Sequence, residues 1–210
     1  MLIRNFLRVF FYLLYHPFAF TYDLVAAAVS FGHWKNWAAE IIPFIEGTRI
    51  LELGHGPGHL QRILHDHGFD SAALDESPQM GQLAKRRVGS GHQLTRGVAQ
   101  HLPFASNSFD TVVSTFPTEY IFDLRTLSEI GRCLSNKGKL VVMPVAFPTS
   151  RVLQWLYQIT GETPSALEES LLSKIKQPFI IAGFKTETQI IEVQSGQLLI
   201  IIARKTNALI

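Results

Sequence analysis

RILELGHGPGHL, residues 49–60, is the stretch of sequence that predicts the fold. A short apolar run ends near the acid Glu52, breaks into three alternating glycines, and resumes with helical spacing at Leu60. This pattern is typical of a buried strand, a tight turn and a helix N-terminus, the usual cradle for a nucleotide-like ligand. Glycine suits such a turn because the backbone needs unusual φ/ψ angles and a ligand must approach it closely. The stretch predicts an α/β fold with a ligand site at the turn; a similar turn without a ligand is the alternative.

The spacing of the glycines separates two ligand classes. Dinucleotide-binding proteins carry G-x-G-x-x-G, whereas this chain carries G-x-G-x-G after an acid. The stretch resembles motif I of the class I S-adenosylmethionine (SAM)-dependent methyltransferases, E/D-x-G-x-G-x-G. The resemblance implies that Glu52, Gly54, His55, Gly56 and Gly58 belong to a binding site for SAM, or for its product S-adenosylhomocysteine. A dinucleotide-dependent oxidoreductase is the disfavoured alternative.

A second acid follows at the distance expected for ribose recognition. Residues 71–75 form a short predicted strand ending in Asp75, which lies 17 residues after Gly58. Doubly wound folds place an acid about 20 residues beyond the glycines, where it accepts from ribose hydroxyls. We therefore predict that Asp75 binds the ribose, with Glu76 as the neighbouring alternative. Ser77 is a predicted N-cap of the next helix.

The segment TRGVAQHLPF, residues 95–104, extends the resemblance. Methyltransferases of this family carry G-D-A-x-x-L-P-F here, and the acid contacts the adenine amino group. Val98 takes the place of that acid. The resemblance then implies that the adenine relies on apolar packing and on the backbone of Val98, Ala99 and Gln100.

The segment TFPTEY follows the next predicted strand, which begins near Phe109. Because ligands bind at strand carboxyl ends in open α/β sheets, Thr115 and Phe116 are predicted to face the cofactor and the transferred methyl group. Methyl transfer depends mainly on alignment, so a general base is optional. The candidates, by position alone, are Glu119, Tyr120 and His101.

Several classes of function are disfavoured. The net charge of +2 provides no basic surface for nucleic acid, and the methyltransferase motifs for base methylation, (N/D/S)-P-P-(Y/F/W) and Pro-Cys, are missing. His55 and His59 are separated by Gly56, Pro57 and Gly58, so they share no helical face, and no residue set has metal-ligand spacing. We predict no metal and no nucleic acid partner.

The N-terminal segment leaves two alternatives open. Residues 1–20 are rich in aromatic side chains and carry Arg4 and Arg8. The apolar run within them is too short to span a bilayer. They form either a lid on the domain or a peripheral helix at a membrane interface. Tyr22 resembles a tyrosine that approaches SAM in related small-molecule enzymes, and Trp37 is predicted to pack on the core together with Trp34.

The C-terminal half completes the predicted fold. A strand over 139–143 precedes a helical insertion, residues 147–178, and then a hairpin running from Phe184 to Arg204. The prediction is a Rossmann-like, seven-stranded, mostly parallel sheet with an antiparallel C-terminal hairpin and helices on both faces. Residues 1–48 are predicted as a helical cap and residues 49–210 as the SAM-binding domain.

The resemblance implies a SAM-dependent methyltransferase that moves the sulfonium methyl by in-line displacement to a small acceptor. The aromatic N-terminus and the apolar insertion favour an apolar or lipid-like molecule. The alternative is a non-catalytic SAM-binding or membrane-associated partner protein that keeps the fold. The expected location is the cytoplasm, with peripheral contact at the inner membrane face as a variant of it.

Overall fold

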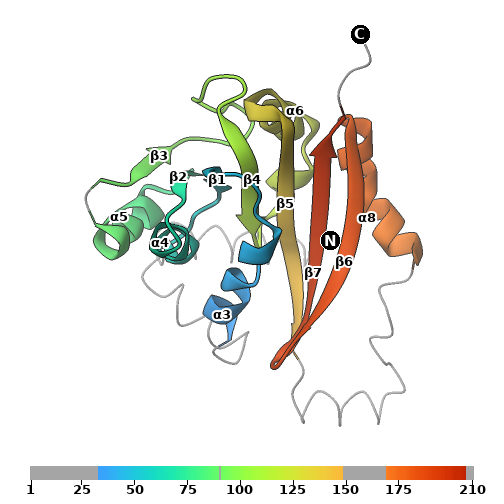
Figure 1. The fold of residues 1–210 in the computed structure, drawn as a ribbon, viewed down its shortest axis with the longest axis horizontal. Coiled ribbons are helices and arrows are strands. Elements are labelled where there is room, and N and C mark those ends of the chain that lie inside the picture. The colour runs from blue at the N-terminus through green and yellow to red at the C-terminus, as the bar shows by residue number, and fades with distance from the viewer. Residues whose placement is uncertain (1–32, 90, 149–168, 207–210) are drawn as a thin grey trace, which may run out of the picture.

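The structure is a computed structural model that describes residues 33–89, 91–148 and 169–206. Its centre is one seven-stranded sheet with the order β3-β2-β1-β4-β5-β7-β6 (Figure 1). In chain order the strands are β1 (Arg49–Leu53), β2 (Asp70–Asp75), β3 (Gln93–Arg96), β4 (Phe109–Thr115), β5 (Leu134–Pro148), β6 (Phe184–Val193) and β7 (Gly196–Lys205).

The pairing of the strands confirms the predicted fold class. β1 pairs in parallel with β2 and β4, and the ladder continues in parallel to β3 on one side and β5 on the other. β7 runs antiparallel to both β5 and β6. The sheet is therefore parallel except for one strand, β7, which lies between its two antiparallel neighbours.

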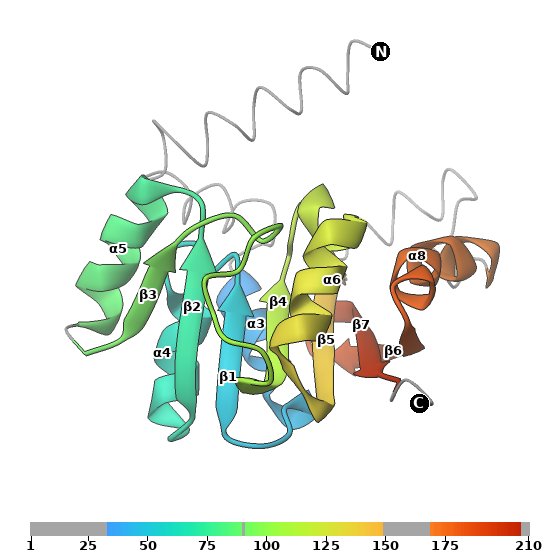
Figure 2. The ribbon, with the colours of Figure 1, turned by 90° about the horizontal axis from the view of Figure 1, so that it is seen from above.

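Helices pack on both faces of the sheet. On one face lie α3 (Trp34–Ala39), the 3-10 turn η2 (Ile42–Phe44) and α4 (His59–Asp66), while α5 (Pro78–Val88) packs on α4, β2 and β3. On the other face lie the 3-10 turn η3 (Glu119–Phe122), α6 (Leu124–Cys133) and α8 (Glu169–Ile181). Figure 2 shows α6 in front of the sheet and α3 behind it.

The alternation of side chains along β1 explains this three-layer arrangement. Ile50 joins a core cluster with Leu60 and Leu64 of α4, whereas Leu51 and Leu53 join the cluster beneath α6. Successive side chains of a strand point to opposite faces, so a central parallel strand covered on both sides is apolar throughout. Glu52, on the face of Ile50, is the one polar residue among the buried positions of this strand.

β5 begins at Leu134, five residues before the start of the predicted strand at residue 139. Leu134 pairs with Phe109 and Lys139 pairs with Thr111, so the register shifts and residues 135–138 bulge out of the ladder. Residues 135–138 thus lie within an irregular strand rather than before it. The strand is also longer than predicted, because its far end pairs with β7 as far as Pro148 and Gly196.

Two long-range contacts fix the ends of the sheet. The Trp37 indole Nε1 donates to Ser195 Oγ at 2.8 Å and so joins α3 to the turn between β6 and β7. At the amino ends of the strands, Glu46 bridges the buried Lys139 (N–O 2.7 Å) and Arg204 (2.8 Å). Trp37 is buried, as predicted, while the side chain of Trp34 lies outside the described residues.

The predicted cap, residues 1–48, and insertion, residues 147–178, fall largely outside the described residues, so their division from the domain stays a prediction. Within the described part, α3 packs on α4, and α8 packs on β6 and α6. No helix in that part of the chain is long and apolar enough to cross a membrane.

Candidate functional site

The candidate site lies at the edge of the sheet where the parallel strands end. β1, β2 and β4 end side by side at this edge (Figure 2). The Gly54 backbone N–H donates to the carbonyl of Leu74 on β2 at 2.8 Å, which carries the ladder one residue into the loop. The glycine loop, residues 54–58, then leads directly into α4, as the sequence predicts.

The three glycines of the loop all have positive φ, but a side chain would meet different surroundings at each. A Cβ at Gly54 would overlap the hydroxyl of Tyr120, and one at Gly58 would lie 2.9 Å from the Cβ of Ala84 on α5. At Gly56 (φ +51°) no described atom lies within 4 Å of that position. Gly56 therefore faces the space that a ligand could enter, whereas Gly54 and Gly58 permit close packing within the protein.

Asp75 holds the glycine loop to the end of β2. Its Oδ2 accepts from the Gly56 N–H at 2.8 Å, and its Oδ1 accepts from the Ser77 N–H at 2.8 Å. A carboxylate has about four acceptor positions, so each oxygen keeps capacity for a further donor such as a hydroxyl. Glu76 is exposed, and its carbonyl accepts from Arg96 Nε. Of the two predicted ribose acids, Asp75 is the one in contact with the loop.

Glu52 is buried beneath the loop, with a side chain that is 2 % exposed. Its Oε2 has no hydrogen-bond partner in the described part of the chain. Burial raises the pKa of Glu52 to about 8; the charge of Asp75 adds to this, and a side-chain contact with Gln61 of α4 opposes it. At neutral pH, this carboxyl group is therefore mostly protonated.

His55 is buried within the glycine loop. Its Nδ1–H donates to the Gly56 carbonyl at 2.7 Å, and its own carbonyl accepts from the Gly58 N–H at 2.9 Å. Burial lowers the pKa of this imidazole, although the charge of Asp75 acts in the opposite direction. The described residues contain no group of three or more His, Cys, Asp or Glu side chains that could hold a metal ion.

The predicted adenine segment begins against the same edge. The Gly97 N–H donates to the carbonyl of Asp75 at 3.1 Å, so Val98, Ala99 and Gln100 follow directly. Val98 is 41 % exposed and Ala99 is buried. The Gln100 side chain contacts Asp123, the N-cap of α6, at 3.4 Å.

An ion pair on α6 holds the remainder of that segment. Glu129 accepts from the Leu102 N–H at 2.8 Å, while Arg132 donates to the carbonyls of Leu102 and Phe104. Arg132 also binds Glu129 and holds the pKa of that carboxyl at about 2. The segment is thus fixed in place although it is neither helix nor strand.

Thr115 and Phe116 lie at the end of β4, as predicted. Phe116 has φ +50°, a left-handed conformation that is uncommon for a residue other than glycine. Its N–H donates to the Met143 carbonyl at 2.7 Å, and its ring lies 6.4 Å from that of Trp37. Conformations of this kind persist where the surroundings enforce them and concentrate at functional sites.

The three base candidates have different surroundings. The hydroxyl of Tyr120 donates to the Leu53 carbonyl at 3.0 Å and lies 2.9 Å from Ser114 Oγ, so it is part of the packing at the end of β1. Glu119 is exposed; His101 is exposed too, close enough to Glu129 to influence its pKa. Tyr22, a predicted cofactor contact, lies outside the described residues.

Sequence reasoning missed two supports of the loop. Arg87 of α5 donates to the Pro57 carbonyl, while its neighbours Lys85 and Arg86 are exposed. Gln61 of α4 is fully buried beside Glu52, and its Oε1 accepts from Ser71 Oγ at 3.2 Å. The one sequence signal for Arg87 is the small residue Ala84, three positions earlier on the same helical face.

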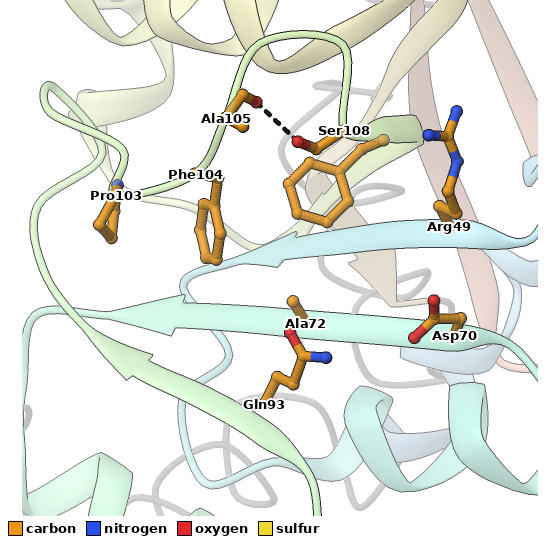
Figure 3. Close-up of a pocket in the computed structure, with 9 residues that line it drawn as sticks. Arg49, Asp70, Ala72, Gln93, Pro103, Phe104, Ala105 and Ser108 are labelled. Carbon is orange, nitrogen blue, oxygen red and sulfur yellow. Dashed lines mark hydrogen bonds between the residues drawn. The ribbon is translucent and has the colours of Figure 1, made fainter.

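A separate hollow of about 330 Å³ opens at the opposite, amino edge of the sheet (Figure 3). Phe104 and Phe109 form its apolar wall, with Arg49, Asp70 and Gln93 around them. It lies at the starts of β1 and β2, so it is distinct from the site at their carboxyl ends.

Comparisons with known proteins agree with this geometry. Residues 51–142 match the family model described as a methyltransferase domain. A demethylmenaquinone methyltransferase from Thermotoga maritima is 31% identical over 144 residues, which cover 66% of this chain and 62% of that protein. The chain thus spans less than two thirds of the length of this relative.

Solved structures share the fold at lower sequence identity. A protein from Methanococcus maripaludis, described as a SAM-dependent methyltransferase, superposes with a TM-score of 0.63 at 19% identity, covering 91% of this chain and 94% of its own. A phosphoethanolamine N-methyltransferase from Haemonchus contortus, with S-adenosylhomocysteine bound, superposes with a TM-score of 0.60 at 19% identity, covering 84% of this chain and 53% of its own. At 19% identity, these similarities concern the fold alone.

Proposed function

We propose that this chain, which belongs to the class I SAM-dependent methyltransferase family, binds SAM at the carboxyl edge of β1, β2 and β4 and transfers its methyl group to a small apolar acceptor. The observation that carries the proposal is the loop itself. Gly56 is open on its outer side, Asp75 accepts hydrogen bonds from the Gly56 and Ser77 N–H groups, and Glu52 lies buried beneath the loop with an unpartnered oxygen.

The residues present suit SAM in charge and in shape. The cofactor carries an ammonium group and a sulfonium, and the buried Glu52 supports a site for positive charge. The spare acceptor positions of Asp75 suit the two hydroxyls of a ribose. Phosphate groups would meet two carboxyl groups at this edge, which disfavours a dinucleotide.

In this proposal the chain contributes mainly alignment. SAM supplies an electrophilic methyl group on a good leaving group, so the protein needs to hold the acceptor in line and keep water out. The S–CH₃ bond breaks as the bond from methyl to acceptor forms, and the acceptor loses a proton to water or to a base. Phe116, held in place by Met143 and Trp37, lies at the strand end where the acceptor would approach.

We further propose that the acceptor is a quinol of the kind that the demethylmenaquinone methyltransferase relative is named for. The apolar side chains Phe116 and Val98 near the strand ends support a planar apolar molecule rather than a charged one. The match covers only 62% of that relative's length, so the acceptor of this chain is not inferred from the relative alone and needs an experiment of its own.

The experiment is transfer of a labelled methyl group from SAM to a panel of reduced demethylated quinones, with S-adenosylhomocysteine binding measured on the same sample. Label in a quinol, lost in Gly56→Val, is the expected result. Binding without transfer to any acceptor, the panel and a lipid extract included, would favour the non-catalytic SAM-binding partner instead.

Contact of residues 1–20 with a membrane surface is a further proposal, supported by their aromatic residues and by Arg4 and Arg8. Co-sedimentation with anionic vesicles is expected to fall after deletion of residues 1–16. Unchanged co-sedimentation would instead favour the lid alternative for this segment.

A further inference from the structure

The carboxyl group of Glu52 is buried at the site without a full set of hydrogen-bond partners in the described structure. Its carboxyl group is almost completely buried, and one oxygen has no partner among the described residues. On the facing helix α4, the fully buried Gln61 contacts the Glu52 side chain, although its Nε2 makes no hydrogen bond of ordinary length in that part of the chain. Buried polar groups are normally satisfied, so a buried carboxyl oxygen without a hydrogen bond marks a position where a further donor can bind.

The described side chains around Glu52 provide no positive charge to pair with its carboxyl group. α4 presents the neutral Gln61, β2 presents the carboxylate of Asp75, and the loop presents the neutral imidazole of His55. No ion pair joins Glu52 to a cationic side chain anywhere in the described ranges. Arg87 of the neighbouring α5 donates instead to the Pro57 carbonyl. An ionised Glu52 would be a buried charge without a counterion, which is costly.

We propose that Glu52 holds a proton in the ligand-free protein and releases it when the positively charged amino-acid part of SAM enters the site. This rests on the function proposed above and deepens it. The step balances as one proton lost from the Glu52 carboxyl to solvent for each ammonium-bearing ligand bound. The carboxylate that forms is then stabilised by the ammonium group, because an opposite charge within a few ångströms favours the charged form.

Two consequences follow for binding. Below the pH range in which the free Glu52 titrates, the affinity for the ligand should rise about tenfold per pH unit, and it should level off above that range. Ligands that share the adenosine and thioether parts of SAM but lack the ammonium group should bind without releasing a proton. Glu52 thereby distinguishes the complete cofactor from its fragments.

The test is calorimetric titration with S-adenosylhomocysteine at neutral pH, in phosphate and in Tris. These buffers differ in ionisation enthalpy, so the difference in measured heat counts the protons released. Close to one proton per ligand is expected for the unaltered protein. Glu52→Gln, which keeps the shape but cannot ionise, should bind more weakly and release none. The same titration with 5′-methylthioadenosine, which lacks the ammonium group, should show no proton release. This comparison uses the unaltered protein, so it tests the proposal even if Glu52→Gln does not fold.

The outcomes separate this inference from the proposed function. Binding with a heat that is the same in both buffers would overturn the proton release while leaving the cofactor site intact. Equal proton release by Glu52→Gln would assign the proton to another group and would also overturn it. Failure of S-adenosylhomocysteine to bind the folded protein would overturn both.

Discussion

At the scale of single residues, neighbouring positions of one motif have different physical roles. Gly54 and Gly58 make room for Tyr120 and Ala84, whereas Gly56 borders open space. Asp75 and Glu52 are both acids at strand ends, but backbone N–H groups satisfy the first, while burial leaves one oxygen of the second without a partner. The motif therefore combines residues that shape the loop with residues that we propose face the ligand.

Removal of the Asp75 carboxylate tests its two roles together. Asp75→Ala leaves the Gly56 and Ser77 N–H groups without their acceptor and removes the predicted ribose contact. We expect the dissociation constant for S-adenosylhomocysteine to rise at least tenfold, about 1.4 kcal/mol or more. Asp70→Ala, at the exposed start of the same strand, is the control and should leave binding unchanged. Equal affinity of all three proteins would remove Asp75 from the site.

The hydroxyl of Tyr120 provides a second test. Tyr120→Phe removes the contacts to the Leu53 carbonyl and to Ser114 without changing the ring. We expect a loss of about 1 kcal/mol in the free energy of unfolding, the usual value for a partly buried hydrogen bond, measured by denaturant titration. Ser114→Ala should cost a similar amount, and the double variant less than the sum. Full additivity would show that the two hydroxyls do not act as one unit.

At the scale of elements, the sequence pattern was most informative where local signals coincide. The ends of β1 and β2, the N-cap Ser77 and the C-terminal hairpin were predicted because glycine, serine or an acid ends each apolar run. The bulge at residues 135–138 was not, because it depends on the register between β4 and β5, which no local pattern encodes. Arg87 was missed for the same reason, since its partner lies 30 residues away.

The packing of α4 against α5 predicts a difference between two glycines of one helix. Gly58 and Gly68 flank α4 with φ of +83° and +78°, but only at Gly58 would a Cβ meet Ala84, at 2.9 Å. Gly68→Ala should cost about 1 kcal/mol, from backbone strain alone. Gly58→Ala adds the steric conflict and should cost about 2–4 kcal/mol. Thermal or denaturant unfolding measures both, and equal losses would contradict the packing account.

At the scale of the whole molecule, the two edges of the sheet differ in charge and in role. The carboxyl edge holds Glu52 and Asp75, the acids that we propose bind SAM, while ion pairs hold the amino edge together. There Asp110 accepts from the Thr48 and Arg49 N–H groups and pairs with the Arg49 side chain. The sequence predicted that Glu52 and Asp75 lie at one edge because the fold brings the ends of parallel strands together. It could not predict which of the two carboxyl groups has hydrogen-bond partners, since that depends on tertiary contacts.

The Glu46 bridge predicts how stability depends on pH. Hydrogen bonds from Arg204 and Lys139 lower the pKa of Glu46 to about 2, from an ordinary value of 4.5. Its contribution is therefore complete above about pH 4.5 and is lost as the pH falls towards 2. Glu46→Gln should cost about 1 kcal/mol at neutral pH, since the half-exposed side chain is screened by solvent. The two proteins should become equally stable near pH 2, and an equal gap at both pH values would contradict this.

The most direct test of the central claim is calorimetric titration of the purified protein with S-adenosylhomocysteine, with NAD as the control ligand. The account predicts saturable binding of S-adenosylhomocysteine alone, and its loss in a folded Gly56→Val variant, whose side chain would enter the open space beside the loop. Absence of binding by the folded protein, equal binding of NAD, or unaltered binding by Gly56→Val would contradict a SAM site at the carboxyl edge of this sheet.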